Sequence, residues 1–324
     1  MAKHGNRMRR ATGPGTIVAM VTASGVRIGW EDLPERVRRA VTDIVGGEVV
    51  EAVSQSGGFS PGTADRIRTA DGRRAFVKAV SQAQNEDSPR LHRHEARVTA
   101  ALPPDAPAPT LLGTYDDGDW IALVLSDVDG RHPVTPWRQD ELTQVRKALD
   151  DLARTLTPSP IGHVPAARDH LEQDLAGWHR LRADPPADQD SWITAHLDDL
   201  CRHAEHGVTA LAGNTLAHTD IRADNLLIDR HGTVTVVDWP WACRGPRWLD
   251  TLLLLINVRL YGGHADLDTI DAKRDDLIGV LAGFGGFFAD AARCPAPPGL
   301  PSLREFQQAQ ADVVVSWLQE LLSD

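Results

Sequence analysis

An Asp-Gly pair at positions 71 and 72 lies between two segments whose side chains alternate, and it strongly limits how the chain can fold. Asp-Gly between alternating segments is typical of a tight turn that joins two antiparallel strands. The two strands would be residues 63–69 and Arg74–Val80. Because side chains alternate across a strand, the second strand should present two faces. One face would carry Ala75, Val77 and Ala79, and the other Phe76, Lys78 and Val80.

The segments around this hairpin extend the pattern into a small sheet. Val49–Val53 reads as a strand that enters a glycine-rich turn, and residues 110–115 and 120–125 read as two more strands. Helical spacing of apolar residues predicts helices at 31–45 and 88–102. Further along, the pattern is mainly helical, at 138–155, 169–182, 191–210, 248–260, 268–291 and 302–322. Two short strands, Leu226–Ile228 and Val234–Val237, interrupt it.

These elements predict an α+β fold with two lobes. Residues 31–125 would form a small antiparallel sheet lobe with one helix, and residues 131–324 a larger, mainly helical lobe. The polar segment 126–130 would link the lobes as a hinge. Residues 1–30 carry five basic side chains and no acidic one, and we expect them to form a flexible basic tail.

Composition excludes several classes of function. The chain has 324 residues and a net charge of −11, which argues against a protein that mainly binds nucleic acid and slightly favours a cationic partner. No apolar run approaches the roughly 20 residues that a membrane-spanning helix needs. The three cysteines, Cys201, Cys243 and Cys294, are widely spaced and odd in number, which is typical of a reducing cytosol. We therefore expect a cytoplasmic protein.

One constellation carries the chemistry. His218 and Asp220 precede Asn225, and an apolar strand then ends at Asp238, followed by Trp239. Phosphoryl transfer needs a carboxylate near the acceptor hydroxyl and oxygen ligands for magnesium. Asp220 would meet the first need, and Asn225 with Asp238 the second. The spacing therefore predicts a phosphotransferase site.

Three features of the first lobe fit the same chemistry. The glycines of the turn, Gly57, Gly58 and Gly62, would let the backbone approach phosphate groups closely. Lys78 could reach these phosphates as a point charge. Glu95, on the next helix, could hold Lys78 by an ion pair.

Taken together, these residues resemble the kinase fold, and more closely the aminoglycoside phosphotransferase family than the protein kinases. The resemblance covers roughly residues 45–255 and is carried by His218–Asn225 and by the stretch from Asp238 to Asp250. An Asp-Trp pair stands where protein kinases have Asp-Phe-Gly. Thr219 departs from the family, in which glycine is common before the catalytic aspartate. The short interval from Asp238 to Asp250 leaves no room for the activation segment of a protein kinase.

The resemblance implies the cofactors ATP and Mg²⁺ and a role for each residue. Asp220 would orient and partly deprotonate the acceptor hydroxyl, and Arg222 could touch the transferred phosphoryl group. Asn225 and Asp238 would bind magnesium, and Asp250 would brace the catalytic loop. The remaining residues would bind the nucleotide through the glycine-rich loop, the phosphates and the hinge: Ser56, Gly57, Gly58, Phe59, Ser60, Gly62, Lys78, Glu95, Ser126 and Val128.

The acceptor is the least determined part of this interpretation. We expect a small hydroxylated molecule, with an aminoglycoside or another hydroxylated antibiotic as the leading class. A metabolite kinase acting on a sugar or amino alcohol is the alternative, and a nucleotide-binding pseudokinase sensor is a third hypothesis. Two clusters bear on the choice. Trp239, Trp241 and Trp248 could pack in the core or form an aromatic wall, and Asp188, Asp190, Asp198 and Asp199 could be solvated or attract a polyamine.

Overall fold

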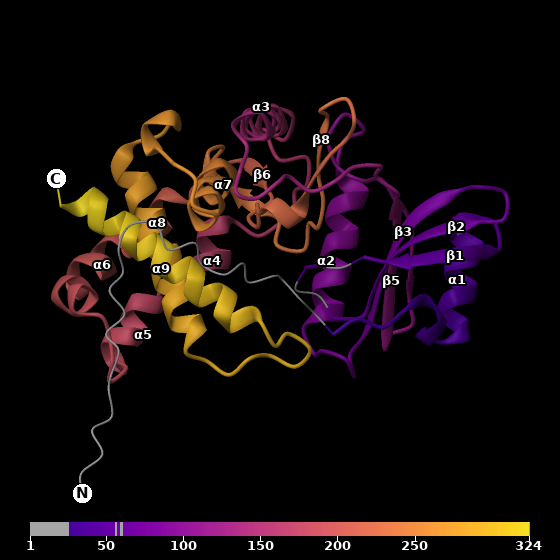
Figure 1. Cartoon of the computed structure of the whole chain (residues 1–324), viewed down its shortest axis with the longest axis horizontal. Coiled ribbons are helices and arrows are strands. Elements are labelled where there is room, and N and C mark those ends of the chain that lie inside the picture. The colour runs from indigo at the N-terminus through magenta and orange to yellow at the C-terminus, as the bar shows by residue number, and fades with distance from the viewer. Residues whose placement is uncertain (1–25, 56, 59–60, 324) are drawn as a thin grey trace, which may run out of the picture.

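The computed structural model describes residues 26–55, 57–58 and 61–323, which form two lobes (Figure 1). The smaller lobe is built on a five-stranded antiparallel sheet in the order β1-β2-β3-β5-β4, and the larger lobe is mainly helical. This confirms the predicted fold class. Ser56, Phe59 and Ser60, three of the residues expected to cover the nucleotide, lie outside the described residues, as do residues 1–25.

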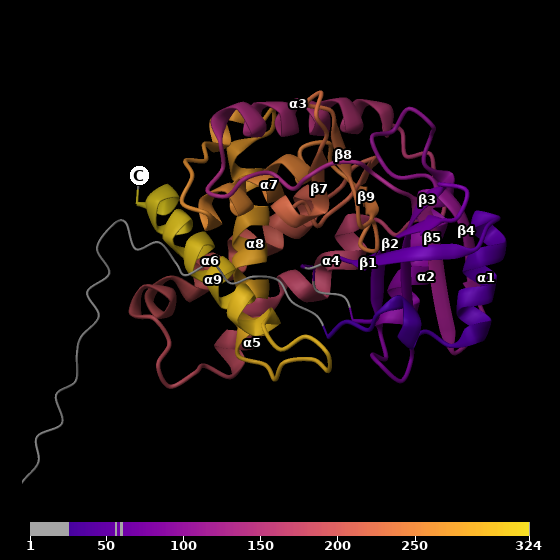
Figure 2. The same cartoon turned by 45° about the vertical axis from the view of Figure 1, so that its right-hand side comes forward.

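The sheet of the smaller lobe has the two faces that the sequence predicts. Its strands are β1 (Val49–Ser54), β2 (Thr63–Thr69), β3 (Arg74–Ser81), β4 (Leu111–Asp116) and β5 (Trp120–Ser126). Ala75, Val77 and Ala79 pack against α1 (Glu35–Val45), while Val80 packs against α2 (Ser88–Ala101) on the opposite face. The helices predicted at 31–45 and 88–102 therefore cover opposite faces of the sheet. Lys78 lies on the same face of β3 as Val80, and α2 lies between the sheet and the larger lobe (Figure 2).

The larger lobe packs its helices around one apolar core. The helices are α3 (Gln139–Thr155), α4 (Ala167–Leu175), α5 (Gly177–Ala183), α6 (Ser191–Ala210), α7 (Leu249–Leu260), α8 (Arg274–Ala292) and α9 (Leu303–Leu322). The short strands are β6 (Thr215–Ala217), β7 (Leu226–Ile228), β8 (Val234–Val236) and β9 (Cys243–Gly245). β7 pairs with β8, and β6 pairs with β9, a pairing that the sequence did not predict. Short turns of 3₁₀-helix lie at Trp30–Asp32, Ala223–Asn225 and Leu267–Thr269.

α8 runs through the centre of this core and lets its neighbours approach closely. A Cβ atom on Gly177 would lie 2.0 Å from the carbonyl oxygen of Gly286, and one on Gly207 would lie 2.3 Å from that of Gly279. Only residues without a Cβ permit these backbone contacts of α5 and α6 with α8. The predicted helix 169–182 is in fact two helices, and the second begins at Gly177, where this contact with α8 is made.

The segment 26–30 is part of the fold, which corrects the prediction that the tail extends to residue 30. Val26 and Ile28 exchange backbone hydrogen bonds with Gly62, and Trp30 is buried against the sheet. The N–H of Val26 also donates to the carbonyl of Gly299 in the larger lobe, at 2.9 Å. Nothing in the sequence indicated this packing, because the partners of the segment lie far along the chain.

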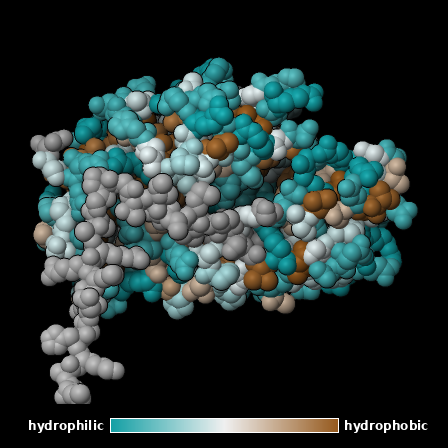
Figure 3. Space-filling view, in the orientation of Figure 1, coloured by the Kyte–Doolittle hydropathy of each residue, from teal (hydrophilic) through white to brown (hydrophobic). Residues whose placement is uncertain are grey.

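The outer surface is mostly hydrophilic on the face that Figure 3 shows. The large apolar side chains that remain exposed include Val50 and Val53 on β1 and Trp241. Within the described part of the chain, no helix is both long enough and apolar enough to cross a membrane.

Candidate active site

Lys78 joins the two lobes through an ion-paired network. Its Nζ atom lies 2.8 Å from Glu95 Oε1, 2.9 Å from Glu95 Oε2 and 2.5 Å from Asp238 Oδ1. Burial alone would lower the pKa of Lys78, but the charges of Asp238 and Glu95 outweigh burial and raise it. Burial opposes the ionisation of Asp238, yet Lys78 lowers the pKa of that carboxyl to about 2. The ion pair of Lys78 on β3 with Glu95 on α2 is present as predicted, and Asp238, after β8, joins it, a contact that the sequence did not predict.

Asp220 lies on the loop between β6 and β7 with two partners. Its carboxylate accepts from Arg222 Nη1 at 2.8 Å and from the side-chain amide of Asn225 at 3.1 Å. Burial raises the pKa of Asp220 to about 7, although the charge of Arg222 opposes the shift. Arg222 also pairs with Asp224 at 3.0 Å, so its guanidinium holds two carboxylates in place.

Asp250, on α7, holds the backbone of this loop by hydrogen bonds. The two oxygens of that buried carboxylate accept from the backbone N–H groups of His218, at 2.8 Å, and Thr219, at 2.9 Å. Thr219 has a φ of 64°, in the left-handed region that β-branched residues rarely adopt. Glycine, which the resemblance leads one to expect at this position, would adopt such a φ without strain. The predicted brace, Asp250, is in contact with it.

His218 links the loop to the strand that carries Asp238. Its Nδ1 atom accepts from the N–H of Asp220 at 3.2 Å, so Nε2 carries the proton and donates to the carbonyl of Val237 at 2.9 Å. Burial lowers the pKa of His218, which keeps the ring neutral and this pattern intact. Asp238 itself has a φ of 68°.

Asn225 and Asp238 offer oxygen atoms that suit a magnesium ion. The amide nitrogen of Asn225 donates to Asp220, which leaves its side-chain oxygen as the atom for a cation. The carboxylate of Asp238 is ionised, and the N–H of Val237 donates to the carbonyl of Asn225 at 3.0 Å, which ties the two segments together. One carboxylate and one amide oxygen are hard ligands of the kind that Mg²⁺ prefers.

A cavity of about 510 Å³ between the lobes is lined by five of the ten residues expected to bind the nucleotide, while three of the others lie outside the described residues and Glu95 reaches the cavity only through Lys78. Gly57, Gly58, Lys78, Ser126 and Val128 line it. Gly62 does not, because it packs against β3, where a Cβ atom would lie 2.3 Å from the carbonyl oxygen of Ala79. Its role is in the packing of the turn.

The hinge is held to the sheet by a paired carboxylate. Asp127 accepts from Arg66 Nε at 2.7 Å and from Arg74 Nη2 at 2.6 Å. These contacts fix the hinge beside the nucleotide cavity, which Asp127 and Arg66 also line.

Two residues of the site escaped the sequence analysis. Arg27 lines the nucleotide cavity, donates to the carbonyl of Gly57 at 2.7 Å and lies in the electrostatic field of Asp238. Asn257 on α7 accepts from the backbone N–H of Ala223 at 3.2 Å and so supports the catalytic loop. In the sequence, Asn257 stands out only as a single amide in an apolar run, and nothing distinguishes Arg27 from the other arginines.

A second cavity, of about 410 Å³, lies on the other side of Asp220. We call it the acceptor cavity. Asp220, Arg222 and Asp238 line it, and Phe306 lies between it and the nucleotide cavity, lining both. The arrangement places one carboxylate, Asp220, beside a space that can hold a second substrate.

The sequence left two interpretations open for the tryptophan cluster and two for the acidic cluster. The structure places the two clusters differently with respect to the acceptor cavity. Trp239 is buried and contacts His218 edge-on, whereas Trp241 lines the acceptor cavity and is 37% exposed. Of the three tryptophans, Trp241 alone therefore forms part of an aromatic wall of the acceptor cavity. The acidic cluster lies just before and within α6, and none of its residues lines either cavity; Asp190 caps the helix by accepting from Trp192 N at 2.8 Å.

The family model for the phosphotransferase enzyme family matches residues 56–284, which span the whole arrangement described above. The chain belongs to this family. Members of the family transfer phosphoryl groups to hydroxyl groups. A search of curated proteins finds no match to this chain.

Solved structures of several small-molecule kinases share the fold of the chain. An aminoglycoside phosphotransferase from Alicyclobacillus acidocaldarius is 18% identical, with a TM-score of 0.54 over 91% of this chain and 98% of that one. Amicoumacin kinase hAmiN, in complex with AMP-PNP and Ca²⁺, is 13% identical, with a TM-score of 0.54 over 86% and 94%. Choline kinase LicA from Streptococcus pneumoniae is 11% identical, with a TM-score of 0.53 over 89% and 97%. At these identities the likeness concerns the fold.

Proposed function

We propose that this phosphotransferase moves the γ-phosphoryl group of ATP to a hydroxyl group of a small molecule and requires Mg²⁺. The observation that carries the proposal is Lys78, whose Nζ contacts Glu95 on one side and Asp238 on the other, next to the loop of Asp220. A buried lysine held by two carboxylates at a cavity of this size suits the phosphates of a nucleotide. A solved structure with this fold is a complex with AMP-PNP, which supports ATP as the donor.

The reaction follows from the placement of Asp220. The acceptor hydroxyl would donate a hydrogen bond to this carboxylate, and its oxygen would attack the γ-phosphorus. The new bond joins that oxygen to phosphorus, and the bond from phosphorus to the bridging oxygen breaks. The electron pair leaves with ADP, and the proton passes to Asp220. Arg222 and Asn225 keep the carboxylate aimed at the acceptor cavity.

Bound at Asn225 and Asp238, Mg²⁺ would neutralise charge on the phosphate oxygens. The chain supplies an ionised carboxylate and an amide oxygen for this purpose, which fits one or two protein ligands with the phosphates completing the shell. Lys78 would remain the protein's own cation against the α- and β-phosphates.

The test is phosphoryl transfer from Mg-ATP to hydroxylated small molecules, read by mass spectrometry. We expect a product one phosphoryl group heavier than the acceptor, and we expect Asp220→Asn to lose about a thousandfold in kcat while it still binds nucleotide. That loss corresponds to about 4 kcal/mol of barrier. Asp238→Ala should instead lose the magnesium dependence of nucleotide binding, measured by titration with and without Mg²⁺. Normal turnover by Asp220→Asn would contradict the proposal.

The antibiotic, metabolite and sensor hypotheses differ in their expected outcomes. Transfer to an aminoglycoside would support a resistance or self-protection enzyme, and transfer to a sugar or amino alcohol would support a metabolite kinase. Nucleotide binding without transfer or hydrolysis would support a sensor. The ion-paired Lys78, Glu95 and Asp238 favour an active enzyme over a sensor. The fold itself accommodates acceptors of different chemistry, since its solved examples include amicoumacin kinase and choline kinase.

A further inference from the structure

The acceptor cavity is walled by apolar side chains from three helices of the larger lobe. α7, α8 and α9 contribute most of this wall: Leu253, Ile256, Phe284, Phe288, Leu303 and Phe306. Phe284 and Phe288 are 6% and 7% exposed, so they are core residues with one edge on the cavity. Apolar walls around a few polar groups are typical of sites that bind the carbon framework of a ligand.

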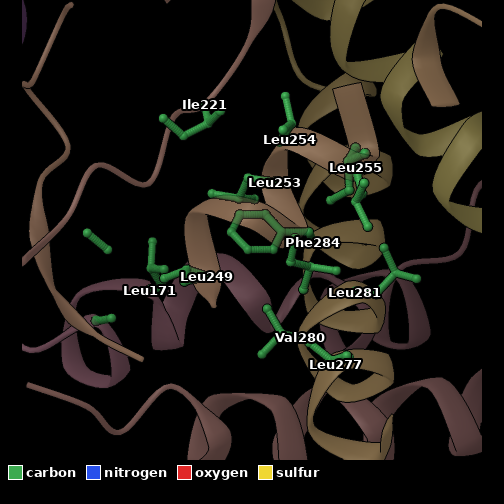
Figure 4. Packing of buried hydrophobic residues seen from close by; sticks show 14 of the residues in the cluster. Leu171, Ile221, Leu249, Leu253, Leu254, Leu255, Leu277, Val280, Leu281 and Phe284 are labelled. Carbon is green, nitrogen blue, oxygen red and sulfur yellow. The ribbon is translucent and has the colours of Figure 1, made fainter. Parts of the chain in front are cut away.

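The wall is rigid because its residues pack on one another. The rings of Phe287 and Phe288 have centroids 5.3 Å apart, and those of Phe284 and Phe288 are 5.9 Å apart. Figure 4 shows Phe284 beside Leu253, with Ile221 of the catalytic loop nearby. The close contacts of Gly177 and Gly286 fix α8 and therefore hold these rings in place.

The charged groups at the inner end of the cavity are already paired. Glu95 and Asp238 both bind Lys78. Asp220 is paired with Arg222. A cationic group would have to compete with Lys78 and Arg222 for these carboxylates.

The outer end of the acceptor cavity also has few carboxylates that could pair with a cation. Asp87 lies 3.9 Å from Arg90, and both line the mouth of the cavity. The other carboxylate there is Asp174, whose pKa is raised by burial and which has no ion-pair partner among the described residues. His92 also lines the cavity and stays neutral, because burial lowers its pKa to about 3. The other polar side chains of the lining, among them Asn257, Gln307 and Gln310, are neutral, so a polycation would leave several of its charges without a counter-charge, which is costly.

We infer that the phosphoryl acceptor is an uncharged, largely apolar alcohol whose carbon framework fills the acceptor cavity while its hydroxyl group reaches Asp220. This inference rests on the proposed function and narrows its acceptor class. It runs against the expectation of a cationic acceptor that net charge alone favours. The apolar wall favours a ligand with an apolar carbon framework, and the paired carboxylates disfavour a ligand with a positive charge.

Two matched pairs of alcohols test the inference. In each pair, a quaternary carbon is replaced by a quaternary nitrogen, so that size and shape are kept and only charge changes. The pairs are 3,3-dimethylbutan-1-ol with choline, and trans-4-tert-butylcyclohexanol with its trans-4-trimethylammonio analogue. Equilibrium binding to the full chain in the presence of Mg²⁺ and AMP-PNP is measured by ligand-observed NMR, and phosphorylation with Mg-ATP is measured by mass spectrometry. We expect the neutral member to bind at least tenfold more tightly in both pairs.

Variants of Phe287 provide the matched control. Phe287 lines the cavity and is only partly buried, so it tolerates a charge better than Phe284 or Phe288. Phe287→Asp places a carboxylate in the wall and should reduce or reverse the preference for the neutral member. Phe287→Leu keeps the wall apolar and should leave the preference unchanged.

The outcomes separate this inference from the proposed function. Binding of neither member, equal binding, or tighter binding of the cationic member would overturn the inference. If Mg-AMP-PNP still binds in that case, the proposed function stands with a different acceptor class. If Mg-AMP-PNP does not bind at all, the proposed function itself fails.

Discussion

The carboxylate of Asp250 holds Thr219 in a backbone conformation that β-branched residues rarely adopt. The contact, 2.9 Å from Thr219 N to Asp250 Oδ1, is one of two that the carboxylate makes with the catalytic loop. The hydroxyl of Thr219 adds a third restraint by donating to the carbonyl of Trp241 at 2.7 Å. A left-handed residue without such support would cost about 1–2 kcal/mol. The loop that carries Asp220 therefore depends on a residue outside the reaction.

Asp250→Ala should lower both stability and turnover. The change leaves two backbone N–H groups without their acceptor, and each costs about 1–3 kcal/mol when buried. Urea unfolding should show a loss of about 2 kcal/mol or more, and kcat should fall while nucleotide binding persists. Asp250→Asn keeps one acceptor oxygen, so its stability and its kcat should lie between those of the parent chain and those of Asp250→Ala. An unchanged kcat in folded Asp250→Ala would show that Asp250 does not position Asp220.

The activity should rise with pH through neutrality because the pKa of Asp220 is raised to about 7. Below that pH the buried carboxyl is protonated and does not accept the proton of the hydroxyl, so kcat/KM should fall about tenfold per pH unit. Stability should change in the opposite direction. The pKa in the folded chain exceeds the ordinary value of 3.8, so the contribution is full below about pH 4 and is lost as the pH rises to about 7.

Arg222→Gln is the control for this pH profile. The charge of Arg222 opposes the rise in the pKa of Asp220, so its removal should move the apparent pKa further up. Measuring kcat/KM from pH 5.5 to 9, chosen to bracket about 7, would show the shift. A profile that does not move in Arg222→Gln would assign the titration to another group.

Arg27→Ala should weaken nucleotide binding. Arg27 lines the nucleotide cavity near Asp238, and a charge-assisted hydrogen bond to a phosphate contributes about 1.5–3 kcal/mol. We expect the Kd for Mg-ATP to rise about tenfold or more, with a smaller effect on kcat. Arg27→Lys keeps the charge and should retain part of the affinity. An unchanged Kd in a folded Arg27→Ala variant would leave Arg27 a packing residue.

Gly177→Ala should destabilise the larger lobe. The added Cβ would lie 2.0 Å from the carbonyl oxygen of Gly286, so α5 and α8 would have to separate. Overpacking of this kind costs about 1–3 kcal/mol, measurable as a lower midpoint of urea unfolding. Gly162→Ala is the matched control, because no heavy atom lies within 4 Å of the new Cβ there. Equal midpoints in the two variants would mean that the helices adjust without cost.

The parts of the site that the sequence predicted are those encoded by local spacing. Lys78 follows from the alternation of one strand, and Asp220, Asn225 and Asp238 follow from the order of a loop and a strand. The ion pair of Lys78 with Glu95 follows from the position of the next helix. Each of these inferences needed only neighbouring residues or a fixed order of elements.

The parts that the sequence did not predict depend on contacts between distant segments. Arg27 lies in a segment that resembles a tail, and only its pairing with Gly62 brings it to the cavity. The wall of the acceptor cavity comes from α7, α8 and α9, whose relative placement depends on the packing of the larger lobe and not on local spacing. The contact of Arg222 with the phosphoryl group stays a prediction, and the sequence did not indicate that its guanidinium also holds Asp220 and Asp224.

The hydrogen bond from Val26 to Gly299 also sets an order of assembly. Its two residues come from near opposite ends of the chain, so it can form only after both lobes have folded and met. The N–H of Val26 should therefore be among the last to gain protection from hydrogen exchange during folding, and later than that of Ile28, which donates to Gly62 within the smaller lobe. Because Arg27 of this segment and Phe306 of α9 both line the nucleotide cavity, that cavity becomes complete only after both lobes have folded.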